Sequence, residues 1–118
     1  GLTPALANAV QSAALPFLPG VASASELMAA QAAGFDTFKL FPAEAVGGIK
    51  LLQALAGPFA DARFCPTGGI TPTNAADYLA LPNVLAVGGS WLTPKAAVAA
   101  QDWAEITRLA KAAGALRV

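Results

Sequence analysis

The stretch Phe35-Asp36-Thr37-Phe38-Lys39-Leu40-Phe41-Pro42-Ala43-Glu44 decides how the rest of the chain is interpreted. It has the composition of a short buried strand that stops at a proline, because strands buried on both faces are nearly continuous apolar runs. Side chains alternate across a strand, so Thr37, Lys39 and Phe41 share one face and the two residues between them share the other. We expect the second face to pack on helices. The first face would then place an amine beside an aromatic ring in a confined space.

Lys39 is the chemical candidate in this stretch. A charge inside an apolar run is costly unless it has a partner or loses its proton. A lysine that is withdrawn from water can be neutral at physiological pH, and its amine is then a nucleophile toward a carbonyl carbon. A lysine can also extend its ammonium outward at the end of a strand. The stretch by itself does not decide whether Lys39 is a catalytic amine or a solvated ammonium.

Length and composition limit what the chain can be. Its 118 residues suit one domain over 1–118. The chain is 56% hydrophobic and only 12% charged, which is about half the charged fraction of an average soluble domain, roughly 25%. We therefore expect it to bury surface against a partner. The net charge is zero, so nucleic acid is not an expected partner. No apolar run reaches the roughly 18 residues of a membrane span, so we expect no membrane segment.

The residue types exclude several kinds of chemistry within this chain. Histidine is absent and Cys65 is the only cysteine, so no zinc site of His and Cys and no Ser-His or Cys-His nucleophile pair can form. No disulfide can form within the chain, which fits a reducing cytoplasm, and we predict a cytoplasmic protein. Lys39, a few carboxylates, hydroxyls and glycine-rich backbone remain as chemical candidates.

Helix and strand signals alternate along the chain. A helix is expected from Thr3-Pro4 to about Ala14, and four strand–helix units follow it. The strands are expected at Leu15–Val21, in the Lys39 stretch, in Arg63–Ile70 and in Asn83–Ser90, and the helices at Ser23, Gly47-Gly48, Thr71-Pro72, Thr93-Pro94 and Asp102. Regular alternation implies an α/β fold with parallel strands, and four such units resemble half of an eight-fold barrel.

Two glycine-rich loops follow the last two expected strands. Thr67-Gly68-Gly69 and Gly88-Gly89-Ser90 each let the backbone approach a ligand without a side chain in the way. Exposed N–H groups beside a helix N-terminus form an anion site, and eight-fold barrels commonly bind phosphate after their last two strands. The alternative is that both loops are tight turns only.

Other residues have weaker signals. Glu44 is the carboxylate nearest to Lys39 in sequence, and it can be read as a proton shuttle or as a residue that favours the start of the next helix. Cys65 is expected to be an inert thiol on a buried strand. Trp91, Trp103 and Tyr78 are expected to be packing residues.

Three segments carry a resemblance to a known family. Phe38–Glu44 (FKLFPAE), Arg63–Ile70 (RFCPTGGI) and Val87–Leu92 (VGGSWL) closely resemble 2-keto-3-deoxy-6-phosphogluconate aldolase, whose family also covers 4-hydroxy-2-oxoglutarate aldolase. The resemblance spans essentially the whole chain. It implies a class I aldolase of the Entner–Doudoroff pathway on a (β/α)8 TIM barrel, usually a trimer, which requires no metal and no organic cofactor.

The resemblance also implies roles for single residues. Lys39 matches the Schiff-base lysine, Phe41 the aromatic residue beside the bound ketoacid, Thr67, Gly68 and Gly69 the substrate loop, and Gly88, Gly89 and Ser90 the phosphate loop. The implied reaction cleaves the phosphorylated ketoacid to pyruvate and glyceraldehyde 3-phosphate, with 4-hydroxy-2-oxoglutarate as a second substrate.

One departure from the family concerns length. The family chain is nearly twice as long, and its general-base glutamate and carboxylate-binding arginine have no counterpart here. The chain is therefore expected to be the C-terminal half of the barrel, which needs the N-terminal half or another copy of itself as a partner. The alternative function is a catalytically incomplete half-barrel that only assembles or binds phosphate or sulfate.

Overall fold

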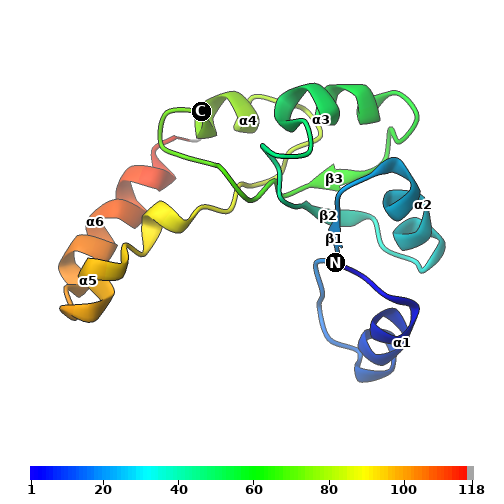
Figure 1. Ribbon diagram of the computed structural model, residues 1–118, viewed down its shortest axis with the longest axis horizontal. Helices are drawn as coiled ribbons and strands as arrows, with labels where there is room; N and C mark the ends of the chain where they lie inside the picture. The colour runs from blue at the N-terminus through cyan, green and yellow to red at the C-terminus, as the bar shows by residue number, and fades with distance from the viewer. Residues whose placement is uncertain (117–118) are drawn as a thin grey trace.

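The computed structural model describes residues 1–116 and shows an α/β fold built on a parallel sheet (Figure 1). The elements are α1 Pro4–Ala13, β1 Gly20–Val21, α2 Ala24–Ala32, β2 Thr37–Leu40, α3 Gly48–Ala56, β3 Arg63–Phe64, α4 Ala75–Leu79, the 3-10 helix η1 Ser90–Leu92, α5 Lys95–Ala99 and α6 Trp103–Gly114. The predicted alternation of strands and helices is confirmed from β1 to α4, and no fourth strand follows α4 in the described residues.

The sheet has the order β1-β2-β3, and both strand pairs are parallel. The stretch around Lys39 therefore forms the central strand. Lys39 lies opposite Gly20 of β1, and Phe38 lies opposite Phe64 of β3. Parallel neighbours require crossover connections, which α2 and α3 supply.

The two faces of β2 differ as the alternation predicts. Phe38 and Leu40 are fully buried on the face that packs on helices, where Leu52 of α3 and Tyr78 of α4 join the same core. The opposite face is more open in residues 1–116: Lys39 is only half-buried and the side chain of the following Phe41 is 48% exposed. The prediction of a strand buried on both faces is therefore wrong for the described chain.

Three helices begin at the predicted caps. The side chains of Thr3, Ser23 and Asp102 each accept a hydrogen bond from the backbone N–H three residues on, which satisfies one of the free donors of a helix start. Gly34 follows α2 with a φ of 92°, a left-handed conformation that glycine adopts without steric cost. These local signals placed the helix ends correctly.

Several element boundaries differ from the prediction, among them the end of β3, which covers only Arg63–Phe64 of the predicted stretch Arg63–Ile70. In the segment expected to be a strand over Leu15–Val21, only the last two residues pair with β2. Pro16 and Pro19 have no backbone N–H to donate to a sheet, which shortens the strand. The helix expected to start at Thr71-Pro72 begins at Ala75, after a turn.

The strand predicted over Asn83–Ser90 forms only isolated bridges. Val84 bridges to Phe64 and Gly88 bridges to Thr67, both in parallel. Between these two points Pro66 lies on the neighbouring segment, and it has no N–H with which to continue the ladder. The segment thus keeps the expected place beside β3 without becoming a regular strand.

The molecule is more extended than its length requires. Its radius of gyration is 15.6 Å, whereas a compact domain of this length has a radius of roughly 13–14 Å. Its accessible surface is 7020 Å², against about 5,900 Å² for a monomer of this mass. Figure 1 shows α2, α3 and α4 around the sheet, while α1 and the pair α5–α6 extend away from it. Within residues 1–116, no helix has both the length and the apolar character to cross a membrane.

Candidate functional site

Lys39 places its amine beside an aromatic ring at the carboxyl end of β2. Its Nζ atom lies 4.9 Å from the centroid of the Phe41 ring, within the range in which a cation is attracted to an aromatic face. The side chain is half-buried on the open face of the sheet. The amine thus lies at the edge of the protein surface, where a small carbonyl compound can reach it.

The turn after β2 is bonded to the first glycine-rich loop. The backbone N–H of Ala43 donates to the carbonyl oxygen of Thr67 at 2.8 Å, and that of Glu44 donates to Gly68 at 3.1 Å. The N–H of Thr67 in turn donates to Leu40 at 2.9 Å. These backbone bonds fix the loop against the end of the Lys39 strand.

Gly68 and Gly69 need to be glycine for two reasons. Their φ angles are 99° and 78°, a region that side chains with a Cβ rarely adopt. A Cβ on Gly68 would also lie 3.1 Å from the Cα of Pro42, and one on Gly69 would lie 2.5 Å from the Cγ of Glu44. The absence of side chains therefore lets the loop lie directly on the turn after β2.

The second glycine-rich loop lies against the first. Gly88 bridges to Thr67, and a Cβ on Gly88 would lie 2.6 Å from the Thr67 hydroxyl oxygen. Gly89 lies under the indole of Trp91, whose ring atoms occupy the space that a Cβ on Gly89 would need. Gly89 has an ordinary extended backbone with a φ of −148°, so the space taken by the indole, and not the backbone conformation, favours glycine here.

The two loops and Phe41 enclose one cavity of about 230 Å³. Its lining residues are Phe41, Thr67, Gly68, Gly69, Ile70, Gly88, Gly89 and Ser90. Every residue that the sequence singled out for the site lines this cavity except Lys39, whose amine lies beside the Phe41 wall. Ile70 was not predicted as a lining residue, although it closes the motif that carries the glycine pair.

Glu44 has a partner that the sequence did not reveal. The buried hydroxyl of Tyr78, on α4, donates a hydrogen bond to the Oε1 atom of Glu44. Burial raises the pKa of Tyr78 above its ordinary value, and the carboxylate of Glu44 raises it further. The first turn of α3 contains no acidic residue, but the Glu44 carboxylate lies 3.1 Å from the position of a Cβ on Gly48, the first residue of α3. The interpretation of Glu44 as a residue that favours the helix start therefore stays a prediction. No sequence signal connects two residues that are 34 positions apart.

Three residues were predicted to be packing or core residues, and the structure confirms one of these predictions. Tyr78 is fully buried, as expected. Cys65 is only half-buried, because it lies just past β3 on the open side of the sheet, so the prediction of a buried core thiol is wrong. Trp103 is 58% exposed at the start of α6, so its prediction as a packing residue is also wrong.

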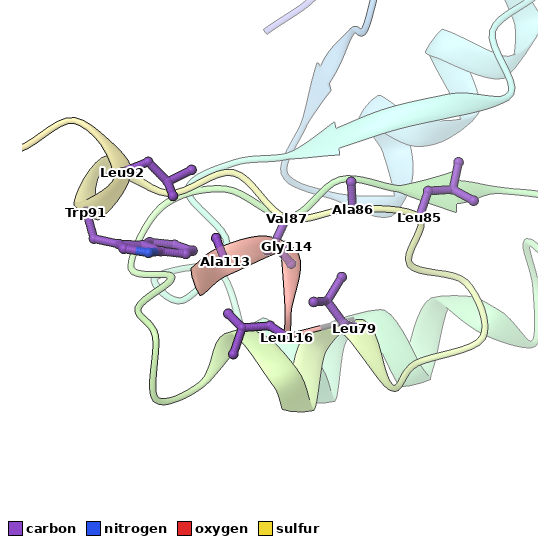
Figure 2. A pocket seen from close by; sticks show the side chains of 9 residues that line it. All are labelled: Leu79, Leu85, Ala86, Val87, Trp91, Leu92, Ala113, Gly114 and Leu116. Carbon is purple, nitrogen blue, oxygen red and sulfur yellow. The ribbon is translucent and has the colours of Figure 1, made fainter. Parts of the chain in front are cut away.

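Trp91 belongs to a second, apolar cavity of about 190 Å³ (Figure 2). In Figure 2 its indole lies at one end of this cavity, with Leu79 of α4 and Gly114 of α6 among the other lining residues. Trp91 therefore touches the glycine loop of the first cavity and also borders the second. No group of three or more His, Cys, Asp or Glu side chains within the described residues could hold a metal ion.

Comparison with known proteins matches one family over most of the chain. The family described as KDPG and KHG aldolase matches residues 1–109. The KHG/KDPG aldolase of Escherichia coli strain K12 is 54% identical over 113 residues, which cover 96% of this chain and 53% of that protein. The chain spans about half the length of the curated relatives it matches.

Solved structures show the same fold. A KDPG aldolase from Legionella pneumophila, with pyruvate captured at low pH as a covalent carbinolamine intermediate, matches with a TM-score of 0.93 and 49% identity over 96% of this chain and 55% of that one. The 2-keto-3-deoxy-6-phosphogluconate aldolase of Zymomonas mobilis ZM4 with 3-phosphoglycerate matches with a TM-score of 0.91 and 46% identity over 99% and 55% of the two chains. This chain belongs to the KDPG and KHG aldolase family.

Proposed function

We propose that the chain carries the Schiff-base lysine and the phosphate loop of a class I aldolase that cleaves 2-keto-3-deoxy-6-phosphogluconate to pyruvate and glyceraldehyde 3-phosphate. Lys39 is the nucleophile. Phe41 and the loop Thr67–Gly69 contact the ketoacid, and the loop Gly88–Ser90 holds the phosphate. The family covers both KDPG and KHG aldolases, so 4-hydroxy-2-oxoglutarate is the second proposed substrate.

One observation carries the proposal. A primary amine lies 4.9 Å from the ring of Phe41, and the same ring forms a wall of the cavity that the two glycine loops enclose. A ketoacid whose carbonyl carbon meets Lys39 can therefore extend along Phe41 into that cavity. The Legionella relative holds pyruvate as a covalent carbinolamine, which is the first adduct that an amine forms with a ketone.

The chemistry follows from the amine. The unprotonated form of the Lys39 amine adds to the C2 ketone to give a carbinolamine, which takes up a proton and loses water to become an iminium. The C3–C4 bond then breaks, its electron pair moves into the iminium to form an enamine, and the proton of the C4 hydroxyl passes to a base. The aldehyde leaves, a proton adds to C3, and water hydrolyses the resulting iminium to pyruvate and free Lys39, which returns the proton taken up when the first iminium formed. Atoms and charges balance without a redox partner.

The glycine loops suit the phosphate end of the substrate. The backbone N–H of Gly88 already donates to the carbonyl oxygen of Pro66 at 2.9 Å. Gly89 has no side chain, so a phosphate can approach the backbone N–H groups of Gly89 and Ser90, and backbone N–H groups are the usual donors at phosphate sites. Ser90 contributes a hydroxyl at the start of η1 and lines the same cavity. The Zymomonas relative was solved with a phosphorylated acid, 3-phosphoglycerate, which is consistent with a phosphate site in this family.

The proposal includes a partner. The chain corresponds to about half of its relatives, and its sheet has an open face and an accessible surface of 7020 Å², well above the roughly 5,900 Å² of a compact monomer. We propose that it provides the C-terminal half of a (β/α)8 barrel. An N-terminal half then supplies the general base and the carboxylate-binding residue and covers the open face, and the complete barrel forms trimers.

Borohydride trapping tests the proposal. The chain is incubated with pyruvate and borohydride, alone and after mixing with the N-terminal half of the Escherichia coli relative, a mixture called the complemented chain below. We expect a reduced pyruvate adduct on Lys39 by peptide mass spectrometry, and aldol cleavage only in the complemented chain.

The variant Lys39→Arg is the control, since it keeps the positive charge but has no amine that forms an imine. A complemented chain that is folded and assembled but forms no adduct would refute the aldolase proposal. Phosphate binding without an adduct would instead favour a half-barrel that only assembles and binds anions.

A further inference from the structure

The Glu44–Tyr78 hydrogen bond lies behind the proposed site rather than in it. Both residues line a separate cavity of about 360 Å³, together with Gly47, Gly48, Ile49, Lys50 and Asn74. Neither lines the cavity that Phe41 and the two glycine loops enclose. Any effect of this pair on the reaction must therefore pass through the backbone that separates the two cavities.

That backbone is the turn after β2. Glu44 lies three residues after Phe41, and its N–H donates to Gly68 of the substrate loop at 3.1 Å. Its side chain lies on Gly69, since a Cβ there would be 2.5 Å from the Glu44 Cγ atom. One residue thus contacts the substrate loop with its backbone and with its side chain.

Two glycines make room for the pair. A Cβ on Gly48, the first residue of α3, would lie 2.6 Å from the Tyr78 hydroxyl and 3.1 Å from the Glu44 carboxylate. Gly69 makes room on the other side of Glu44. Asn74, just before α4, donates to the carbonyl oxygen of Gly69 at 3.0 Å, so α4 is connected to the same loop by a second bond.

Because Tyr78 is fully buried among core residues, the packing around its ring fixes the position of its hydroxyl group. We infer that the hydrogen bond from Tyr78 to Glu44 positions the site: it holds the turn that carries Phe41 at a set distance from the loop Thr67–Gly69. Glu44 and Tyr78 are then positioning residues, not catalytic ones. The inference rests on the proposed function for its kinetic consequences, but its geometric consequence can be measured without any substrate.

The kinetic test compares three variants in the complemented chain. Tyr78→Phe removes the donor and keeps the ring in the core, Glu44→Ala removes the acceptor, and Glu44→Gln keeps an acceptor oxygen at the same place. We expect Tyr78→Phe and Glu44→Ala to raise KM for the phosphorylated ketoacid about ten- to hundredfold, because small misplacements of binding groups have effects of this size. Glu44→Gln should remain near the parent value, and the double variant Tyr78→Phe/Glu44→Ala should be no worse than either single one.

The conservative variant separates this inference from the proton-shuttle interpretation of Glu44. A proton shuttle needs the carboxylate, so Glu44→Gln would lose kcat as fully as Glu44→Ala, and Tyr78→Phe would keep most of its kcat. That pattern overturns the positioning role, and so do additive losses in the double variant.

A matched control removes a different buried hydrogen bond. The side-chain amide of Asn83 donates to the carbonyl oxygen of Leu52 at 2.9 Å in the buried core, away from both glycine loops. Asn83→Ala should lower the melting temperature and leave KM unchanged. If Asn83→Ala raises KM as much as Tyr78→Phe does, the effect is a general loss of stability and the inference is wrong.

The geometric test uses the chain alone. In a nitrogen-15 NMR spectrum, the amides of Gly68 and Gly69 should shift in Tyr78→Phe and remain in place in Asn83→Ala. Unmoved glycine amides in Tyr78→Phe overturn the inference even if the parent chain is an active aldolase. Conversely, shifted amides together with a complemented chain that forms no pyruvate adduct support the positioning role and refute only the proposed function.

Discussion

Replacing Gly89 by alanine provides a quantitative test of the phosphate loop. The φ of Gly89 is −148°, which any residue adopts, so the added methyl group introduces no backbone strain. Its nearest obstacle is Trp91, whose indole occupies the position of the new Cβ. Either the indole or the loop must therefore move. The loss of affinity for the phosphorylated ketoacid depends on how far the loop moves.

The cavity in Figure 2 gives the indole some room. It has a volume of about 190 Å³ and an apolar lining, so part of the conflict can be relieved by a shift of Trp91 away from Gly89. Extra methyl groups in a packed region destabilise by about 1–3 kcal/mol. We assign the lower part of this range, about 1–2 kcal/mol, to the displaced loop. If this cost is lost from substrate binding, it corresponds to a roughly 5- to 30-fold change in the binding constant.

The assay measures two affinities in the complemented chain. Gly89→Ala should raise KM for the phosphorylated ketoacid roughly 5- to 30-fold and leave the half-saturating concentration of pyruvate for borohydride trapping unchanged, because pyruvate has no phosphate. Adding Trp91→Leu should restore most of the affinity. A matched control is Gly57→Ala, since a Cβ there meets nothing within 4 Å. Equal losses for both ligands, or no recovery with Trp91→Leu, would refute the assignment of this loop to phosphate.

Further predictions concern the nucleophile, the buried tyrosine and the core. Lys39→Arg should abolish the pyruvate adduct by mass spectrometry, and an adduct that persists would show that another lysine carries the chemistry. The raised pKa of Tyr78 means that the folded state holds this proton more tightly than the unfolded state, so the contribution of Tyr78 to stability should be constant below pH of about 10 and fall above it. Tyr78 is the only tyrosine, so tyrosinate absorbance and thermal unfolding against pH measure this directly, and Tyr78→Phe should have a weaker alkaline loss. In urea unfolding, Phe38→Ala should lose about 3–5 kcal/mol because Phe38 is fully buried. Trp103→Ala should change stability far less, since that side chain is 58% exposed; a loss as large as that of Phe38→Ala would mean that α6 packs on something outside the described contacts.

Features of the fold that depend on short stretches of sequence could be predicted. The alternation in Thr37–Leu40 predicted which side chains face the helices, because neighbouring side chains of a strand point to opposite faces whatever surrounds them. The caps at Thr3, Ser23 and Asp102 depend on a bond to the backbone three residues on. The glycine pairs were recognisable because a loop that lies against other backbone needs residues without a Cβ.

Features that depend on distant neighbours required the tertiary structure. The segment Asn83–Ser90 has the composition of a strand but forms only two bridges, since its pairing also depends on Pro66 in the segment beside it. Lys39 was expected in a closed space and is half-buried instead, because its exposure is set by what covers the other face of the sheet.

The order of residues along the chain was sufficient to predict the family-like motifs, the strand with its lysine and the two glycine-rich loops. The packed structure was needed to show that the loops enclose one cavity with Phe41, that Tyr78 holds Glu44 and that Trp91 covers Gly89. A turn or a cap is stabilised by groups a few residues apart, whereas a cavity and a buried hydrogen bond exist only once segments far apart in the chain have packed together.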